Sequence, residues 1–199
     1  MRLTHRRITV IGGVACSAML FTSTASGAQA APSSSLAGES ELAGSAVAIS
    51  VAIPAGWHQL TDQSHPEMPQ MVYPVSCSQG PQCATGIARL ASGQAASAHE
   101  AASGAEQTVA TLPGVQGASI TSEGPMQIAG HSGYQVHFAY THANMKFQAA
   151  TAAVETGPAA SGTVPTSLIF VAVTNAAGAP PASVADQIIN SAHLAGQPK

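Results

Sequence analysis

The part of the chain that most restricts its fold runs from residue 119 to residue 174, where strand-like segments follow one another with only short breaks. Two turn sequences, Gly130-His131-Ser132-Gly133 and Ala143-Asn144, separate the first three segments. Because short turns join antiparallel neighbours, this stretch predicts an antiparallel sheet, with its nearly all-apolar last segment at the centre. The four segments with a β-strand pattern are Ser119–Ile128, Tyr134–Thr141, Met145–Glu155 and Leu168–Thr174.

The rest of the chain adds further strands and two helices. Strands are predicted over residues 47–53, 70–75 and 84–90, loops over 58–68 and 156–166, and helices over 97–112 and 182–194. Ser97 is a suitable N-cap for the first helix. In the segment 134–141, alternate residues from Tyr134 to Tyr140 share one face and His137 takes the other. The predicted fold class is therefore α+β, an antiparallel β-sheet flanked by helices.

The N-terminus has the three parts of a secretory signal peptide. Arginines precede an apolar stretch over residues 8–21, and Ala28-Gln29-Ala30 matches an A-x-A cleavage site. Cleavage after Ala30 is expected, followed by a flexible tether over residues 31–45 and a single domain over 46–199. The apolar stretch is shorter than the roughly 20 residues that span a bilayer, and no later segment reaches that length. No transmembrane segment is predicted in the mature chain.

Two other interpretations of the N-terminus stay open. Cys16 would be a lipid attachment site if it ended a lipobox, but Gly13 stands where a bulky aliphatic residue is needed. The Arg6-Arg7 pair would mark twin-arginine export, although the residues around it fit that consensus weakly. All of these routes lead out of the cytoplasm, so the predicted location is secreted, extracellular or in the cell wall.

The charge balance after cleavage narrows the class of partner. The 199-residue chain is 45% hydrophobic and 8% charged, which favours a folded domain over a disordered one. Three basic residues, Arg89, Lys146 and Lys199, remain against nine acidic ones, a formal net charge of −6. Such a chain lacks the basic surface that neutralises phosphates, so nucleic acid is excluded as the expected partner.

Cleavage also leaves two cysteines, Cys77 and Cys83. In an oxidising compartment this pair is predicted to form a disulfide that closes a small loop. The loop-closure entropy of so short a loop contributes about 2 kcal/mol. A redox-active pair is the alternative, but the C-x5-C spacing lacks the C-x-x-C arrangement at a helix start that lowers the pKa of a thiol. The spacing therefore favours a structural disulfide.

The sequence contains no convincing catalytic or metal-binding motif. The turn around Ser132 approaches the nucleophile elbow G-x-S-x-G, but position 134 is Tyr and a strand follows where a helix is needed. The eight histidines show no H-E-x-x-H or C-x-x-C…H spacing. Glu100 and Glu106 lie six residues apart on a predicted helix and do not share a face. No catalytic residue, metal site or cofactor is predicted.

Several of these segments together resemble a known architecture. They are a strand ending in Ile53-Pro54-Ala55-Gly56-Trp57, a long helix, the hairpin over Ile128–Val136, the apolar strand Ser167–Thr174 and a closing helix. From about Ala46 to Leu194 the chain is similar to the Mog1/PsbP-like fold, in particular to LpqN/LpqT-type exported proteins of actinobacteria. The resemblance implies an α/β/α sandwich that acts in the cell envelope or outside it, as a binding or accessory module. Those relatives are often lipoproteins, they supply no catalytic residues, and the cysteine loop is not part of their pattern.

The leading functional hypothesis is a non-catalytic secreted or envelope protein that binds a protein, glycan or lipid partner. A sharper version places a lipid in an apolar cavity between the sheet and its closing helix. The alternatives are a structural or antigenic cell-wall protein without a specific ligand, and a hydrolase or metalloenzyme that uses His131, Ser132 or other histidines. The candidate partner contacts, most of which a simpler interpretation places in the core, are Trp57, His58, Tyr73, Tyr134 and Tyr140.

Overall fold

The structure, a computed structural model, describes residues 40–60, 67–77 and 80–195, and only the backbone at 74–77 and 80–83. The predicted signal peptide therefore lies outside the described residues. The elements are β1 (Glu41–Leu42), β2 (Ile49–Ala52), β3 (His58–Leu60), β4 (Gln70–Cys77), β5 (Gly80–Ala95), α1 (Ala98–Ala110), β6 (Val115–Ile128), β7 (His131–His142), β8 (Met145–Glu155), β9 (Val164–Thr174), α2 (Val184–Asn190) and β10 (His193–Leu194).

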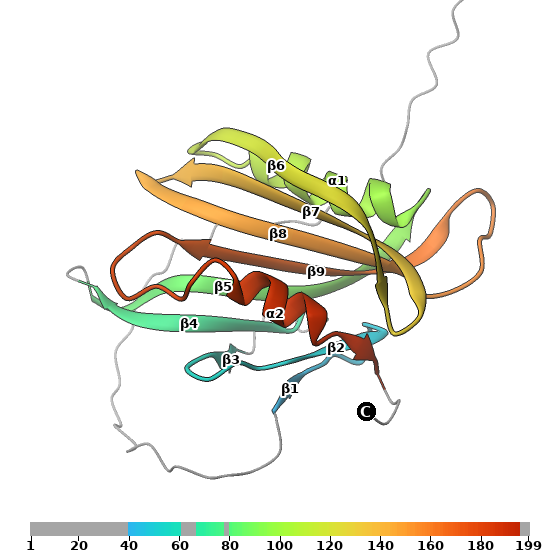
Figure 1. Ribbon diagram of the computed structural model, residues 1–199, viewed down its shortest axis with the longest axis horizontal. Helices are drawn as coiled ribbons and strands as arrows, with labels where there is room; N and C mark the ends of the chain where they lie inside the picture. The colour runs from blue at the N-terminus through green and yellow to red at the C-terminus, as the bar shows by residue number, and fades with distance from the viewer. Residues whose placement is uncertain (1–39, 61–66, 78–79, 196–199) are drawn as a thin grey trace, which may run out of the picture.

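The described strands form two antiparallel sheets (Figure 1). The larger has seven strands in the order β3-β4-β5-β9-β8-β7-β6, and the smaller has the order β1-β2-β10. β9 is the middle strand of the seven, paired with β5 on one side and β8 on the other. The predicted fold class and the central position of the apolar strand ending at Thr174 are confirmed.

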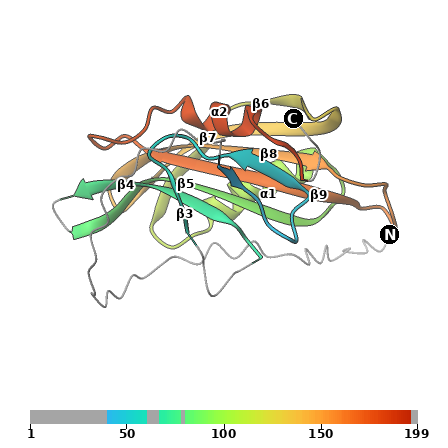
Figure 2. The same cartoon turned by 90° about the horizontal axis from the view of Figure 1, so that it is seen from below.

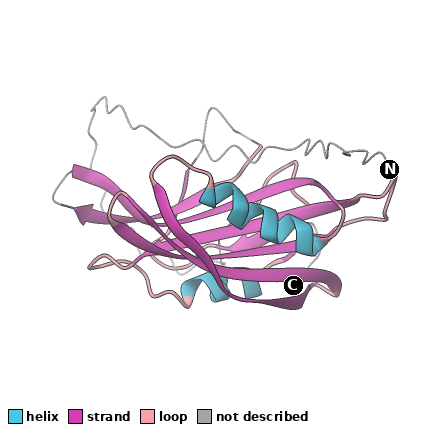
Figure 3. Cartoon of the chain, turned by 90° about the horizontal axis from the view of Figure 1, so that it is seen from above, coloured by secondary structure: helices cyan, strands magenta, loops and turns pink. Residues whose placement is uncertain are grey.

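Each face of the large sheet is covered by one helix (Figures 2 and 3). On the α2 side, Ile169 and Val171 of β9 pack with Ile188 and Ile189 of α2 and with the small sheet. On the α1 side, the buried residues include Val136, Phe138 and a series of alanines from both the helix and the strands. Because alanine side chains are short, α1 lies close to the sheet.

Local sequence explains why α1 begins and ends where it does. The Ser97 hydroxyl accepts a hydrogen bond from the Glu100 backbone N–H at 3.2 Å, which confirms the predicted N-cap. The Glu155 carboxylate of β8 accepts another from the Ala98 N–H at 3.3 Å. Gly114 follows the helix with φ +81°, a conformation that suits glycine. A buried Thr151 hydroxyl also donates to the Ala102 carbonyl at 3.0 Å and ties the helix to the sheet.

The hairpin of β6 and β7 differs from its prediction in the position of the turn. The turn is Ala129-Gly130, with φ values of 51° and 80°, and β7 already begins at His131. The predicted turn residue Gly133 lies inside β7, where a Cβ atom would stand 2.8 Å from the Ala153 carbonyl oxygen. Glycine at position 133 therefore serves close strand packing, and the turn needs only the two residues before β7.

Four further predictions need correction, because tertiary pairing overrides the local pattern. Residues 41–42, predicted as part of a tether, form β1, and Leu42 is fully buried. Residues 58–60, predicted as loop, form the edge strand β3. β4 and β5 extend to within two residues of each other, so both cysteines lie in strands and not at the ends of a loop. The last helix ends at Asn190, and residues 193–194 form β10 against β2.

The two helices are also short on the scale of a bilayer. Within the ranges that the structure describes, neither is long and apolar enough to cross a membrane.

Candidate functional site

The predicted partner contacts do not come together in one place. Trp57 is buried on the α2 side, with Tyr73 of β4 beside it at a ring-centroid distance of 6.0 Å. Tyr134 and Tyr140 of β7 lie on the opposite, α1 side. His58 is exposed on the edge strand β3. The core position expected for Trp57 is confirmed, and these five residues do not form a single binding site.

The two tyrosines on the α1 side each contact another ring. The Tyr134 ring meets the His99 ring of α1 edge to face at 4.4 Å. The Tyr140 ring stacks on the Phe147 ring of β8 at 4.9 Å, with 2° between the planes. Both tyrosines are half-buried, so these contacts hold the α1-side layer together at its edges.

The predicted disulfide falls where only the backbone is described. β4 and β5 pair as antiparallel neighbours, with Val75 opposite Cys83 and Cys77 opposite Gly80. The side chains of the two cysteines lie outside the described part of the structure. The Cys77–Cys83 bond therefore stays a prediction.

The residues considered for hydrolysis or metal binding are also placed. Ser132 is an exposed residue inside strand β7, and not the tip of a turn. His137 points to the α2 side, where its Nε2 atom lies 3.3 Å from the Asp186 carboxylate. Across the described ranges, no three His, Cys, Asp or Glu side chains lie close enough to share a metal ion.

A polar cluster that the sequence analysis missed joins the two ends of the domain. His193 Nε2 lies 2.9 Å from the Ser50 hydroxyl and 3.2 Å from the Glu41 carboxylate, and its Nδ1 lies 3.2 Å from the Ser191 carbonyl oxygen. A carbonyl only accepts, so Nδ1 carries a proton. With Nδ1 as the donor, Nε2 of the neutral ring accepts from the Ser50 hydroxyl.

The Ser50 hydroxyl and the His193 ring are as close as a nucleophile and its base, but a substrate has no access to them. Ser50 is only 2% exposed, because β1 and β10 flank it on either side in the small sheet. A substrate atom cannot reach its hydroxyl in this conformation. The geometry instead links β1 and β2 to β10, which lies at the other end of the domain sequence.

Replacing His193 by alanine is expected to lower the free energy of unfolding by about 1–3 kcal/mol, because the buried Ser50 hydroxyl loses its partner. Urea unfolding followed by circular dichroism measures this loss. The matched control is His58→Ala, which removes an exposed histidine of an edge strand and should leave the midpoint unchanged. Equal midpoints for the two variants would show that the cluster contributes nothing.

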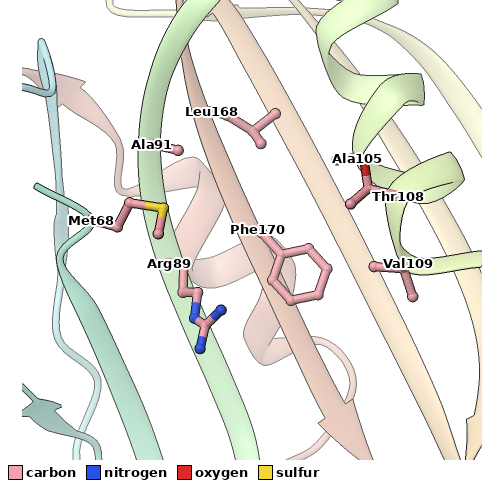
Figure 4. Close-up of a pocket in the computed structure, with 8 residues that line it drawn as sticks. All are labelled: Met68, Arg89, Ala91, Ala105, Thr108, Val109, Leu168 and Phe170. Atoms are coloured by element: carbon pink, nitrogen blue, oxygen red, sulfur yellow. The ribbon is translucent and has the colours of Figure 1, made fainter. Parts of the chain in front are cut away.

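A depression lined mainly by apolar side chains lies beside α1, and we call it the α1 groove (Figure 4). Its floor is formed by β5 and β9, one wall by α1, and the other by Met68, which precedes β4. All but two of its residues are apolar. The residues of the α1 groove are Met68, Arg89, Ala91, Ala105, Thr108, Val109, Leu168 and Phe170.

The size of the groove decides what kind of site it is. The cavity volume of the groove is about 20 Å³, room for one water molecule, and it rises to about 420 Å³ when space open to solvent is counted. The α1 groove is thus an open surface site and not an internal lipid chamber, and it lies beside α1, not beneath the closing helix.

Sequence reasoning missed this groove because its parts come from three distant segments. Arg89 and Phe170 are directly opposite each other in the β5–β9 ladder. Nothing local in either strand indicates that pairing. The one available signal was Arg89 itself, a charged residue in a strand whose other residues are uncharged.

Comparison with known proteins gives a likeness in fold. No protein-family model matches the chain, and no curated protein is significantly similar to it. Among solved structures, it is similar to LpqN, "involved in cell envelope biogenesis of Mycobacterium tuberculosis", with 18% identity over 73% of this chain and 82% of that chain and a TM-score of 0.48. It is also similar to cyanobacterial PsbP (CyanoP) from Synechocystis sp. PCC 6803, with 11% identity over 83% and 98% of the two chains and a TM-score of 0.49.

LpqN and cyanobacterial PsbP are of the two kinds of protein that the sequence resembles. Both identities are below 20% and both TM-scores are below 0.5. Neither match says what this chain binds or does.

Proposed function

We propose that this chain is an exported, non-catalytic binding protein, and that the α1 groove receives the apolar part of a lipid-like partner. The single observation that carries the proposal is the groove itself: an open depression whose floor and walls are apolar side chains of β5, β9 and α1. Covering the apolar side chains of this groove is favourable in proportion to the area removed from water. The signal-peptide pattern before Ala30 supports a place of action outside the cytoplasm.

The hydroxyl groups in the groove and in the His193 cluster favour a binding role over a catalytic one. The groove contains one hydroxyl, Thr108, and that hydroxyl already donates to the Gly104 carbonyl at 2.8 Å within α1. The Ser50–His193 pair, which has suitable distances, is closed to a substrate. A protein or glycan partner is the second candidate, because the stacked rings of Tyr140 and Phe147 lie on the same face of the large sheet as the α1 groove.

Native mass spectrometry tests the proposal on protein purified from the culture medium of the producing organism. The expected spectrum shows the chain cut after Ala30, two hydrogens lighter for a Cys77–Cys83 bond, with a reproducible extra mass that organic solvent removes. Thr108→Glu, which places a carboxylate in the groove, should lose the extra mass. The control Gln107→Glu adds the same charge at an exposed position of the same helix and should keep it.

Two results would contradict the proposal. A bare mass for the native protein would remove the lipid-like partner and direct the search to proteins crosslinked at the cell surface. An extra mass that survives Thr108→Glu would place the ligand away from the α1 groove.

A further inference from the structure

Arg89 is the one charged side chain that lines the α1 groove, and its surroundings are unusual for a cation. It is half-buried in the middle of β5, the third strand of the sheet. The salt bridges within the described ranges all involve histidines, and none reaches Arg89. A half-buried guanidinium is therefore left without an anion among the described residues, in a domain whose acidic residues outnumber its basic ones.

A buried neighbour fixes the orientation of this guanidinium. Arg89 Nε donates to the Gln70 side-chain oxygen at 3.0 Å, and Gln70 is only 2% exposed. The two residues are directly opposite each other in the β4–β5 ladder. With Nε used in this way, the Nη donors of the planar group remain for a ligand. Such a pair of donors matches the two oxygens of a carboxylate or phosphate.

On β5 the groove is lined by Arg89 and Ala91, and Gly93 lies two residues beyond this lining. Ala91 and Gly93 follow on the same face, over a length of roughly 13 Å at the rise of a β-strand. A Cβ atom at Gly93 would meet nothing within 4 Å, so the space above it is open. Figure 4 shows the guanidinium at one end of the groove, beside the Phe170 ring, with Ala91 and Leu168 toward the other end.

We propose that the α1 groove binds a single-chain amphiphile with an anionic head group, its head on Arg89 and its alkyl chain along Ala91 and Gly93. This inference rests on the proposed function and adds the chemical class of the ligand. Charge complementarity selects the anion, because a half-buried cation without a partner is stabilised by one. The linear apolar floor selects an alkyl chain over a compact ring.

The test is a titration of the ¹⁵N-labelled mature protein with sodium dodecanoate, followed by the NMR signals of the backbone and of the Arg89 side chain. Dodecanamide, which has the same chain and a neutral head, is the first control, and sodium acetate, the head without the chain, is the second. We expect shifts at Arg89, Ala91 and Phe170, with dodecanoate binding about tenfold or more tightly than dodecanamide. Acetate should cause no shift at the same concentration.

Variants separate the role of the charge from that of the fold. Arg89→Gln should bind dodecanoate and dodecanamide equally, and Arg89→Lys should restore part of the difference. The matched control is Lys146→Gln, which removes the other cation of the described ranges from an exposed position on β8. It should bind both ligands as the unmodified protein does.

Each other outcome overturns a defined part of this account. If both dodecyl ligands bind the groove equally in the unmodified protein, the anionic head is wrong and the proposed function stands. If acetate binds as tightly as dodecanoate, the site is one for small anions and the alkyl chain is wrong. If neither dodecyl ligand shifts the groove signals, the inference and the proposed lipid-like partner both fail.

Discussion

Replacing Phe138 by alanine is expected to lower the free energy of unfolding by about 3–5 kcal/mol, the largest loss from a single substitution considered for this fold. Phe138 is 1% exposed and belongs to the α1-side core. Its ring lies 6.0 Å from the Tyr140 ring and 6.4 Å from the Phe170 ring. Truncation removes these contacts and leaves a cavity between the sheet and α1, which the packed layers close only in part.

Equilibrium unfolding in urea, followed by circular dichroism, measures this loss. The control is Phe147→Ala on the adjacent strand β8, a residue of the same type that is only half-buried and stacks on Tyr140. Its loss should be less than half as large, since less area is taken from water. Equal losses would mean that the α1-side core is not packed around Phe138.

Replacing Gly86 by valine is expected to destabilise the domain by about 1–3 kcal/mol and to shift the fluorescence of Trp57 to the red. A Cβ atom at Gly86 would stand 2.8 Å from the Trp57 ring and 3.2 Å from the Pro180 ring. Valine therefore pushes the indole away from the sheet and toward water. Trp57 is the only tryptophan of the chain, so the emission spectrum reports on this contact alone.

Gly93→Val on the same strand is the matched control. A Cβ atom there meets nothing within 4 Å, so both stability and the Trp57 emission should stay close to those of the unmodified protein. A red shift in both variants would point to a general loosening of β5. Unchanged emission in Gly86→Val would show that Trp57 does not lie over this strand.

The elements predicted correctly are those whose signal is local and repeated. β8 has the predicted bounds, and the alternation from Tyr134 to Tyr140 places those side chains on one face, as expected. Helix α1 begins at its predicted cap because Ser97 and Glu100 interact within four residues of each other. In both cases the residues that decide the structure are neighbours in the sequence.

The elements predicted wrongly depend on partners far along the chain. The apolar spacing of α2 continues to Leu194, but Leu194 pairs with Ile49 of β2 and the helix ends earlier. β1 is too short for a pattern, and pairing with Val51 opposite Leu42 is what defines it. No local rule contains that information.

The candidate site could not be predicted from the sequence for the same reason. Arg89, Phe170 and Val109 belong to three elements, and only the strand register and the position of α1 bring them together. The aromatic residues chosen from the sequence were reasonable contacts one by one. The fold, however, distributes them over both faces of the large sheet.

The pairing of β2 with β10 has a consequence for the timing of folding. Ile49 meets Leu194, and in the large sheet Ile87 meets Ala172, so both sheets are closed by the last third of the chain. Contacts between residues so distant in sequence make folding slow. A chain that emerges N-terminus first cannot complete either sheet until its final strand has appeared. For the Sec-type export that the predicted signal peptide allows, this order would postpone the native state until the last strand has crossed the membrane.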